Sequence, residues 1–428
     1  MKKSGWFFTF AMAFCAITLV GFNFCESSKN IEDQCYDPIP LNIPKYDFIQ
    51  YQLNELQGNN LDSSFNNFFN KLDQVLSSPD ASLNIVHMGG SHVQAGVLSH
   101  RLRQHFQHLA CDLDAERGLF FPFRLAKTNG PRHLKMERVG EWESTRCAHN
   151  KQRGNWGMTG FQAISVADSS GLDVQAYHKD SISYLFDEIQ LIHDGPIPDF
   201  IYPFPDSLSR DSALRTTRYF WSFPQDTLSI RWNKADSACV YGMIWKNKER
   251  AITYHGIGVN GASTRSYLRC ERMDDELKML NADLVVFGIG INDAYMSETK
   301  FDPNLFESRY DTLVNYFKAA NPEVKFIWLT NNDSYYKKRY PNKNALKVSQ
   351  VMRSLADKHD GAVWDLFGIM GGLGSVRDWQ DAGLANEDKI HFTKAGYELQ
   401  ADLFFDAFRR TYTRRIRDRV ESLNPVSP

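Results

Sequence analysis

The chain has 428 residues, enough for one large domain or two medium ones with buried cores. Hydrophobic residues make up 43% and charged residues 23%, as in ordinary globular proteins, and a formal net charge of −2 gives no electrostatic reason to expect a nucleic-acid partner. The seven cysteines show no C-x-x-C spacing, which argues against a zinc site.

Residues 1–25 have the pattern of an export signal. Lys2 and Lys3 precede an apolar run over 6–22, which is short for a membrane span but leaves an uncleaved anchor open. Cys25 is a candidate lipidation site, although the residues before it are not the small ones that such cleavage favours. We expect an exported, periplasmic or cell-surface protein, in which disulfides are permitted but their pairing cannot be read from the sequence.

Residues 26–80 predict a polar, proline-punctuated tether followed by a helix. A short apolar run at 84–88 then indicates a buried strand, which Gly89 and Gly90 end. Ser91 follows at once, and a helical pattern begins behind it. Ser91 is therefore expected at the carboxyl end of a strand and beside a helix amino terminus, where free N–H groups favour developing negative charge.

Between residues 131 and 250 the helical periodicity fades and short strand-like runs appear, at 182–192, 227–232 and 237–245. Turn sequences such as Asp194-Gly195-Pro196 separate the runs, which favours a β-sandwich-like insertion. Its aromatic residues are expected mostly in the core, with stacking on sugar rings as the alternative. The residues concerned are Trp142, Trp156, Tyr219, Phe220, Trp221, Trp232 and Trp245.

An α/β rhythm returns at residue 251. Apolar strands are predicted at 252–259, 284–287, 324–330 and 362–366, with an amphipathic helix at 345–359 and a last helix from Thr393 to Tyr412. Strands alternating with helices mean a parallel sheet covered on both faces, with its chemistry in loops at the strands' carboxyl ends. Residues 81–130 and 251–412 are thus predicted to form one discontinuous domain. Residues 413–428 are expected to be a C-terminal tail, in which the basic stretch from Arg414 to Arg419 is a solvated helix end.

Four of the expected loops carry the residues that acyl transfer needs. Ser91 follows the first strand, Gly261 the next and Asn292 the third, while Asp388 and His391 lie just before the final helix. An imidazole takes the proton of a serine hydroxyl near neutral pH, and a carboxylate fixes its tautomer and stabilises its charged form. The D-x-x-H spacing lets Asp388 reach one nitrogen of His391 while the other faces Ser91. We predict catalytic roles for Ser91, His391 and Asp388.

The tetrahedral intermediate of such a reaction needs hydrogen-bond donors for its oxyanion. The backbone N–H groups of Ser91 and Gly261 and the side-chain amide of Asn292 are the candidates.

Two histidines, His87 and His92, flank Ser91 and raise the alternative of a metallophosphoesterase. That class needs a carboxylate ligand in the first loop, where Gly89 and Gly90 stand. No metal and no cofactor are therefore expected.

These four blocks resemble those of the SGNH (GDSL-type) hydrolase superfamily. Gly-Gly-Ser91-His92, Asn260-Gly261-Ala262, Gly290-Ile291-Asn292-Asp293 and Asp388-Lys389-Ile390-His391 stand in the order of its nucleophile, its two oxyanion residues and its D-x-x-H dyad. The resemblance implies a flavodoxin-like α/β/α parallel sheet, in agreement with the strand and helix pattern. It departs at Gly90, where the family usually has an aspartate that shapes the turn.

The Ser91-His92 pair and the β-rich insertion, which is similar to a carbohydrate-binding module, loosely resemble the subset that acts on acetylated polysaccharides. The resemblance implies a secreted esterase that removes short acyl groups, acetyl above all, from an acylated carbohydrate or peptidoglycan. Two alternatives stay open: an O-acetyltransferase that uses the same triad, and a catalytically inactive glycan-binding protein.

Overall fold

The computed structural model describes residues 41–110, 113–177, 182, 184–233, 238–247 and 251–423. The export signal, residues 26–40 of the tether and the candidate lipidation site Cys25 lie outside these residues. Within them, no helix is both long enough and apolar enough to cross a membrane. Cys147, Cys239 and Cys270 are buried free thiols.

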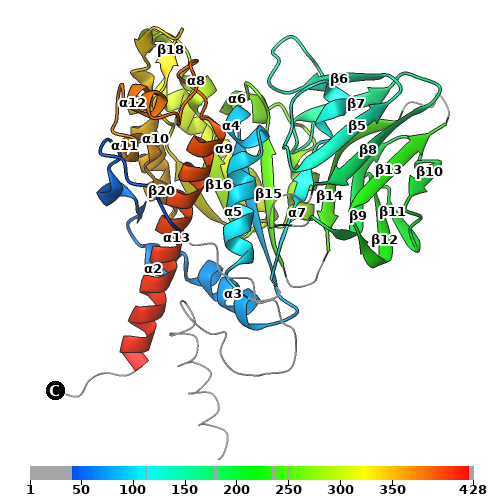
Figure 1. Cartoon of the computed structure of the whole chain (residues 1–428), viewed down its shortest axis with the longest axis horizontal. Helices are drawn as coiled ribbons and strands as arrows, with labels where there is room; N and C mark the ends of the chain where they lie inside the picture. The colour runs from blue at the N-terminus through cyan, green and yellow to red at the C-terminus, as the bar shows by residue number, and fades with distance from the viewer. Residues whose placement is uncertain are drawn as a thin grey trace, which may run out of the picture.

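A seven-stranded sheet lies at the centre of the α/β domain, in the order β1-β20-β17-β16-β2-β15-β3 (Figure 1). Its strands are β1 (Leu56–Gln57), β2 (Ser82–Gly89), β3 (Asp114–Glu116), β15 (Ala251–Gly258), β16 (Leu284–Gly288), β17 (Lys325–Leu329) and β20 (Ala362–Trp364). All pairings are parallel except that of β1 with β20. The predicted parallel α/β sheet is confirmed, with one antiparallel edge strand from the segment read as a tether.

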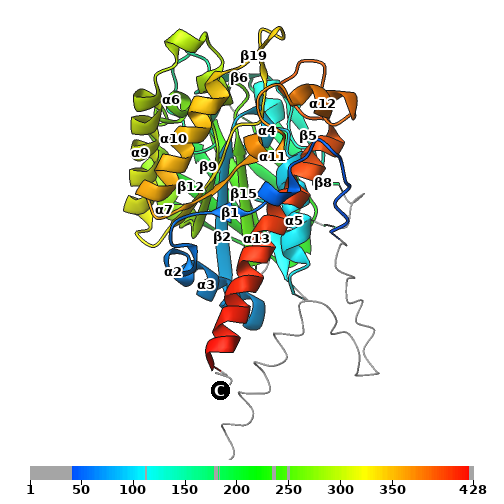
Figure 2. The same ribbon diagram turned by 90° about the vertical axis from the view of Figure 1, so that its left-hand side faces the viewer.

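Helices cover both faces of this sheet because its strands are apolar on both sides (Figure 2). Ile85 packs in the core formed with α3 (Asn66–Ser77), α5 (Val97–Gln107) and α13 (Lys394–Leu423). Val86 and Met88 pack in the core on the other side, with α7 (Met273–Leu280), α9 (Pro303–Ala320) and α10 (Asn344–Lys358).

Short helices and a hairpin occupy the loops. They are η1 (Tyr51–Leu53), α2 (Leu61–Ser64), α4 (Ser91–Gln94), η2 (Phe123–Ala126), α6 (Thr264–Tyr267), α8 (Ile291–Ala294), η3 (Glu298–Lys300), α11 (Leu366–Ile369), α12 (Val376–Asp381) and the pair β18 (Tyr335–Tyr336) and β19 (Tyr340–Pro341).

The insertion consists of antiparallel sheets, as predicted. One has the order β10-β13-β8-β5 and the other β11-β12-β9-β14-β7-β6. Their strands are β5 (Leu134–Val139), β6 (Trp142–Arg146), β7 (Phe161–Ser165), β8 (Ser170–Ala176), β9 (Phe186–Asp194), β10 (Phe200–Tyr202), β11 (Ser207–Asp211), β12 (Thr216–Gln225), β13 (Thr227–Trp232) and β14 (Cys239–Lys246). The aromatic residues named above are buried in it, apart from the half-buried Phe220.

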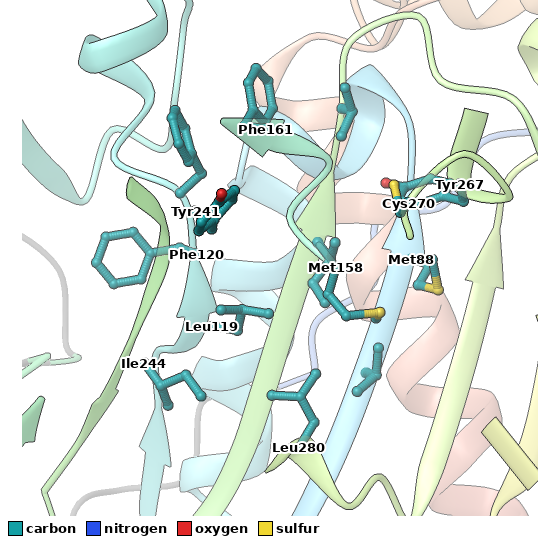
Figure 3. Close-up of a cluster of buried hydrophobic side chains, with 14 of the residues drawn as sticks. Met88, Leu119, Phe120, Met158, Phe161, Tyr241, Ile244, Tyr267, Cys270 and Leu280 are labelled. Atoms are coloured by element: carbon teal, nitrogen blue, oxygen red, sulfur yellow. The ribbon is translucent and has the colours of Figure 1, made fainter. Parts of the chain in front are cut away.

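The insertion shares its core with the α/β domain. Strand β4 (Gly118–Phe120) precedes residue 131 yet pairs with β14 of the insertion. Figure 3 shows side chains of both parts in one cluster, with Met88 of β2 and Leu280 of α7 beside Leu119 and Met158. The insertion is thus built onto the domain through a continuous apolar interface.

Helix α13 runs past Tyr412 into the predicted tail, and Arg414, Arg417 and Arg419 are exposed there as expected. It continues to Leu423, and the guanidinium of Arg415 is buried against α3, where it donates to Asp73 and to two asparagines. The expectation of a solvated basic end is wrong at this residue, because helical spacing turns Arg415 toward α3. Residues 424–428 lie outside the described part.

Candidate active site

The site lies where the strand order of the sheet reverses. Strand β2 has β15 on one side and β16 on the other, and both come later in the chain. In such sheets the connections leave a crevice at the carboxyl ends of the strands. Ser91, Gly261 and Asn292 follow β2, β15 and β16 directly, so this topology brings them to one edge.

Ser91, His391 and Asp388 form a continuous hydrogen-bonded chain. The Oγ of Ser91 lies 2.7 Å from Nε2 of His391, although the two residues are 300 positions apart. The Nδ1 of His391 lies 2.7 Å from Oδ2 of Asp388. His391 therefore stands between a hydroxyl and a carboxylate, the arrangement of a serine nucleophile with its base and the acid that orients it.

Asp388 is held in its ionised form. Burial alone would raise its pKa, but the hydrogen bonds from the His391 ring and from the backbone N–H groups of His391 and Ile390 outweigh it, and the pKa lies well below its usual value. The left-handed backbone of Lys389, with φ of 57°, brings both N–H groups onto Oδ1 of Asp388. The carboxylate remains available to stabilise a charged imidazole.

The candidate oxyanion donors face the same space. Gly261 adopts φ of +82°, a left-handed conformation that glycine adopts without steric cost, and no described residue accepts a hydrogen bond from its N–H or from that of Ser91. The side-chain amide of Asn292 donates to the carbonyl of Ala262 at 2.8 Å, and an amide has a second hydrogen to offer. The structure thus brings all the predicted site residues together.

Gly90 is closely enclosed by this arrangement. A β-carbon at residue 90 would lie 3.1 Å from Nδ2 of Asn292, which is tighter than ordinary contact. An aspartate here, as the resemblance would expect, requires the Asn292 amide to move. Gly90, which departs from the family pattern, thus leaves room for the side-chain amide of Asn292, a candidate oxyanion donor.

Asp293, next to Asn292, has a structural role that the sequence did not reveal. Its buried carboxylate accepts from the backbone N–H of Thr264 at 3.0 Å and from its hydroxyl at 2.7 Å. This joins α8 to α6 and fixes the two loops that carry Asn292 and Gly261. In the sequence, Asp293 stood out only as the last residue of the Gly290-Ile291-Asn292-Asp293 block.

The ring of His92 stacks on that of His391, with centroids 5.1 Å apart and an interplanar angle of 29°. Burial, reinforced by the nearby His391, lowers the pKa of His92 to about 3, so this ring is neutral. Its Nδ1 lies 3.0 Å from the hydroxyl of Tyr397 on α13. His92 thus packs against the His391 ring without adding a charge, and Tyr397 holds His92 in place through its hydroxyl.

The other flanking histidine, His87, precedes Ser91 and takes no part in the site. His87 is buried, its Nδ1 lies 2.8 Å from the hydroxyl of Tyr254, and burial lowers its pKa to about 3. His87 and His92 are therefore both engaged with tyrosine hydroxyls.

A network of side-chain amides lies beside Gly261 and was missed from the sequence. Gln94 accepts from the backbone N–H of Asn260 at 2.6 Å and donates to the carbonyl of Asn129 at 2.7 Å. The Asn260 amide donates to Oδ1 of Asn129 at 2.7 Å. Asn129 lies 131 residues before Asn260 in the chain, so no local sequence motif predicts that the two side chains meet.

These residues surround a pocket of about 640 Å³ that contains Ser91 and His391. Polar groups of Asn129, Asn260 and Tyr295 line it, and Phe392 and Tyr397 add aromatic surface. The pocket can hold an ester at Ser91 with hydrogen-bonding groups around the alcohol part.

Comparison with known proteins adds to this geometry. Residues 231–399 match the model of the GDSL-like lipase/acylhydrolase family, a range that includes Gly261, Asn292, Asp388 and His391 but not Ser91. No curated protein matched the sequence. The structure is similar to that of a peptidoglycan O-acetylesterase, with a TM-score of 0.65 and 20% identity over 83% of this chain and 99% of that chain.

Other similarities cover less of the chain. An acetyl xylan esterase has a TM-score of 0.29 and 22% identity over 37% of this chain and 80% of its own. A GDSL-like lipase from Bacteroides thetaiotaomicron has a TM-score of 0.29 and 16% identity over 37% of this chain and 76% of its own. The family match over residues 231–399 and the shared fold both support the predicted resemblance to the SGNH (GDSL-type) hydrolase superfamily, and with it the prediction of a carboxylic ester hydrolase.

Proposed function

We propose that this protein is an exported serine esterase that removes acetyl groups from a glycan or cell-wall polysaccharide. The observation that carries the proposal is the pair of 2.7 Å contacts that link Ser91, His391 and Asp388 at the pocket. The similarity to a structure described as a peptidoglycan O-acetylesterase supports the choice of substrate class.

The geometry suits a two-step acyl transfer. Ser91 Oγ attacks the acetyl carbonyl while His391 Nε2 takes its proton, and the resulting oxyanion accepts from the N–H groups of Ser91 and Gly261 and from Asn292. His391 then gives the proton to the leaving sugar oxygen. Water, activated by the same imidazole, attacks the acetyl-serine and releases acetate.

The polar rim supports a carbohydrate as the leaving alcohol. Asn129, Asn260 and Asn386 line the pocket with Ser91, and amide groups both donate to and accept from sugar hydroxyls. A lipid ester would cover these amides without offering the donors and acceptors that sugar hydroxyls provide.

The test is acetate release by the purified mature protein from O-acetylated peptidoglycan and acetylated xylan. We expect release from at least one of them, no loss of activity with a chelator, and no release by a folded Ser91→Ala variant. Acetyl groups found on an added glycan acceptor would show an O-acetyltransferase instead. Binding of glycan without release or transfer would show an inactive binding protein.

A further inference from the structure

A hairpin of cationic and aromatic residues stands beside the active-site pocket. Strands β18 and β19 pair Tyr336 with Tyr340, and Lys337, Lys338 and Arg339 form the loop between them. The three cations are exposed, and Tyr340 is 62% exposed. The hairpin lies at the same end of the domain as α4 and α8, which carry Ser91 and Asn292 (Figure 1).

Two contacts attach the hairpin to the site. The backbone N–H of Lys337 donates to the hydroxyl of Tyr295 at 3.1 Å, and Tyr295 lines the pocket. The backbone N–H of Tyr335 donates to the carbonyl of Lys389 at 3.0 Å, and Lys389 lies in the turn between Asp388 and His391. The surface of the hairpin is therefore continuous with the rim of the pocket.

Tyrosine rings connect the cations of this surface. Tyr295 meets Tyr336 edge to face with ring centroids 5.2 Å apart, and the ammonium of Lys337 lies 5.2 Å from the Tyr336 ring. The ammonium of Lys389 and the guanidinium of Arg377 both lie near the ring of Tyr335, at 4.8 and 5.3 Å.

None of these cations has a carboxylate partner among the described residues. Lys337, Lys338, Arg339, Arg377 and Lys389 form no ion pair there, whereas the nearby Lys343 lies 3.6 Å from Glu298. Exposed carboxylates of neighbouring segments do not pair with them either; these are Asp378, Asp381 and Glu387. The positive charge of the rim is left available to a ligand.

The turn itself does not explain the lysines. Lys337 and Lys338 adopt φ of 53° and 59°, the left-handed region that asparagine and glycine occupy most readily in such hairpins. Two successive lysines are a costly choice for this backbone, and their exposed side chains make no ion pair with the described residues that would offset the cost. A ligand that needs both charges accounts for them.

We propose that this hairpin is a subsite for a glycan whose sugars carry carboxylate groups, and that it holds such a chain while an acetyl group enters the pocket. The inference rests on the proposed function and names the substrate class more closely. Carboxylates would meet Lys337, Lys338 and Arg339, and sugar rings would lie against Tyr336 and Tyr340. A neutral glycan would gain nothing from the cations.

The experiment uses chemically O-acetylated polygalacturonate and the same polymer with its carboxylates methyl-esterified. The charge-removing variant is Lys337→Asn with Lys338→Asn, since asparagine suits the left-handed backbone. Lys338→Arg keeps the charge, and Lys135→Ala, on the insertion, is a distant control for an exposed lysine. Acetate release gives kcat/KM for each polymer, and p-nitrophenyl acetate reports the triad alone. Binding without catalysis is measured on native gels that contain either polymer. The proteins compared are Ser91→Ala and Ser91→Ala combined with Lys337→Asn and Lys338→Asn.

We expect wild type to prefer the carboxylate polymer roughly ten-fold, a preference that falls as salt is raised. The double variant should lose most of this preference and keep wild-type activity on p-nitrophenyl acetate. Lys338→Arg and Lys135→Ala should behave as wild type, and the gels should show the same ranking without catalysis. Equal affinity for both polymers in the gels, or an unchanged preference in the double variant, overturns the subsite. If the gels rank the proteins as expected but wild type releases no acetate, the esterase proposal fails and the subsite stands.

Discussion

At the scale of single residues, His391 depends on neighbours that do not react. Asp388 is its ionised partner on one side, and the neutral ring of His92 lies flat against it on the other. The arrangement of Ser91, His391 and Asp388 is therefore held both by hydrogen bonds and by packing, and these two supports can be separated by mutation.

Replacing His92 tests the packing. His92→Ala leaves a space beside His391, and we expect kcat to fall roughly ten- to a hundred-fold, because small misplacements of a catalytic group are expensive. The double variant His92→Phe with Tyr397→Phe restores a ring and leaves no tyrosine hydroxyl unpaired, so it should recover most of kcat. Steady-state kinetics with circular dichroism as a folding check measures both. Equal losses in the two variants would show that the ring nitrogens of His92 matter instead.

Replacing Asn292 tests the oxyanion site. Asn292→Ala keeps Ser91 and His391 intact and removes one donor, so kcat should fall on the order of 10²–10³ while KM changes little. Stopped assays with an activated acetyl ester provide the measurement. A variant with wild-type kcat would remove Asn292 from the oxyanion site.

At the scale of elements, the long C-terminal helix is fixed to α3 through Arg415. Its buried guanidinium donates to Asp73 at 3.1 Å and to Asn66 at 3.1 Å, far along the chain from the active-site loops. We expect Arg415→Ala to lower the free energy of unfolding by about 2 kcal/mol, since charged hydrogen bonds are lost and buried partners are left unpaired.

The neighbouring arginine provides the control for this prediction. Arg414 is 53% exposed and lies 3.9 Å from Asp62, so Arg414→Ala should change stability by less than about 0.5 kcal/mol. Urea unfolding of both variants gives the comparison. An equal loss in the free energy of unfolding for both variants would contradict the prediction that the buried Arg415 fixes α13 to α3.

The elements also show what the sequence could and could not predict. Strands β2, β15, β16 and β17 were predicted because each is a short, almost wholly apolar run ended by glycine or asparagine. Strand β1 was missed because two residues carry no alternation, and its pairing with β20 is decided some 300 residues later. The candidate site was predicted from four short motifs that follow predicted strands or precede the last helix. Gln94 and Asn129 were missed because the hydrogen bonds that join them to each other and to Asn260 are tertiary contacts.

At the scale of the whole molecule, the insertion and the α/β domain meet at a buried carboxylate. Glu276 of α7 accepts from the backbone N–H of Met158 in the insertion at 2.6 Å, and Arg272 lies 3.6 Å away. Burial is the largest influence and raises the pKa of Glu276 to about 7 from an ordinary 4.5, in spite of these contacts.

This shift makes stability depend on pH. Between pH 4.5 and 7 the folded protein holds a proton on Glu276 that the unfolded chain has released, so the free energy of unfolding falls as pH rises through this window. The loss is of the order of 2–3 kcal/mol. Glu276→Gln carries no charge, so its Tm relative to wild type should rise with pH across the window. Asp275→Asn, at an exposed neighbour, should show no such trend. A difference that is flat with pH would mean that Glu276 stays ionised when folded.

Covalent labelling tests whether Ser91 is the nucleophile of a metal-independent ester hydrolase. Wild type is incubated with a fluorophosphonate in the presence of a chelator, and the modified residue is located by mass spectrometry. We expect one label per chain, on Ser91, and a loss of activity in proportion to labelling. Ser91→Ala should take up no label, and His391→Ala should be labelled more slowly than wild type. Activity that survives in folded Ser91→Ala, or that disappears with the chelator and returns with a divalent metal, would contradict the proposal.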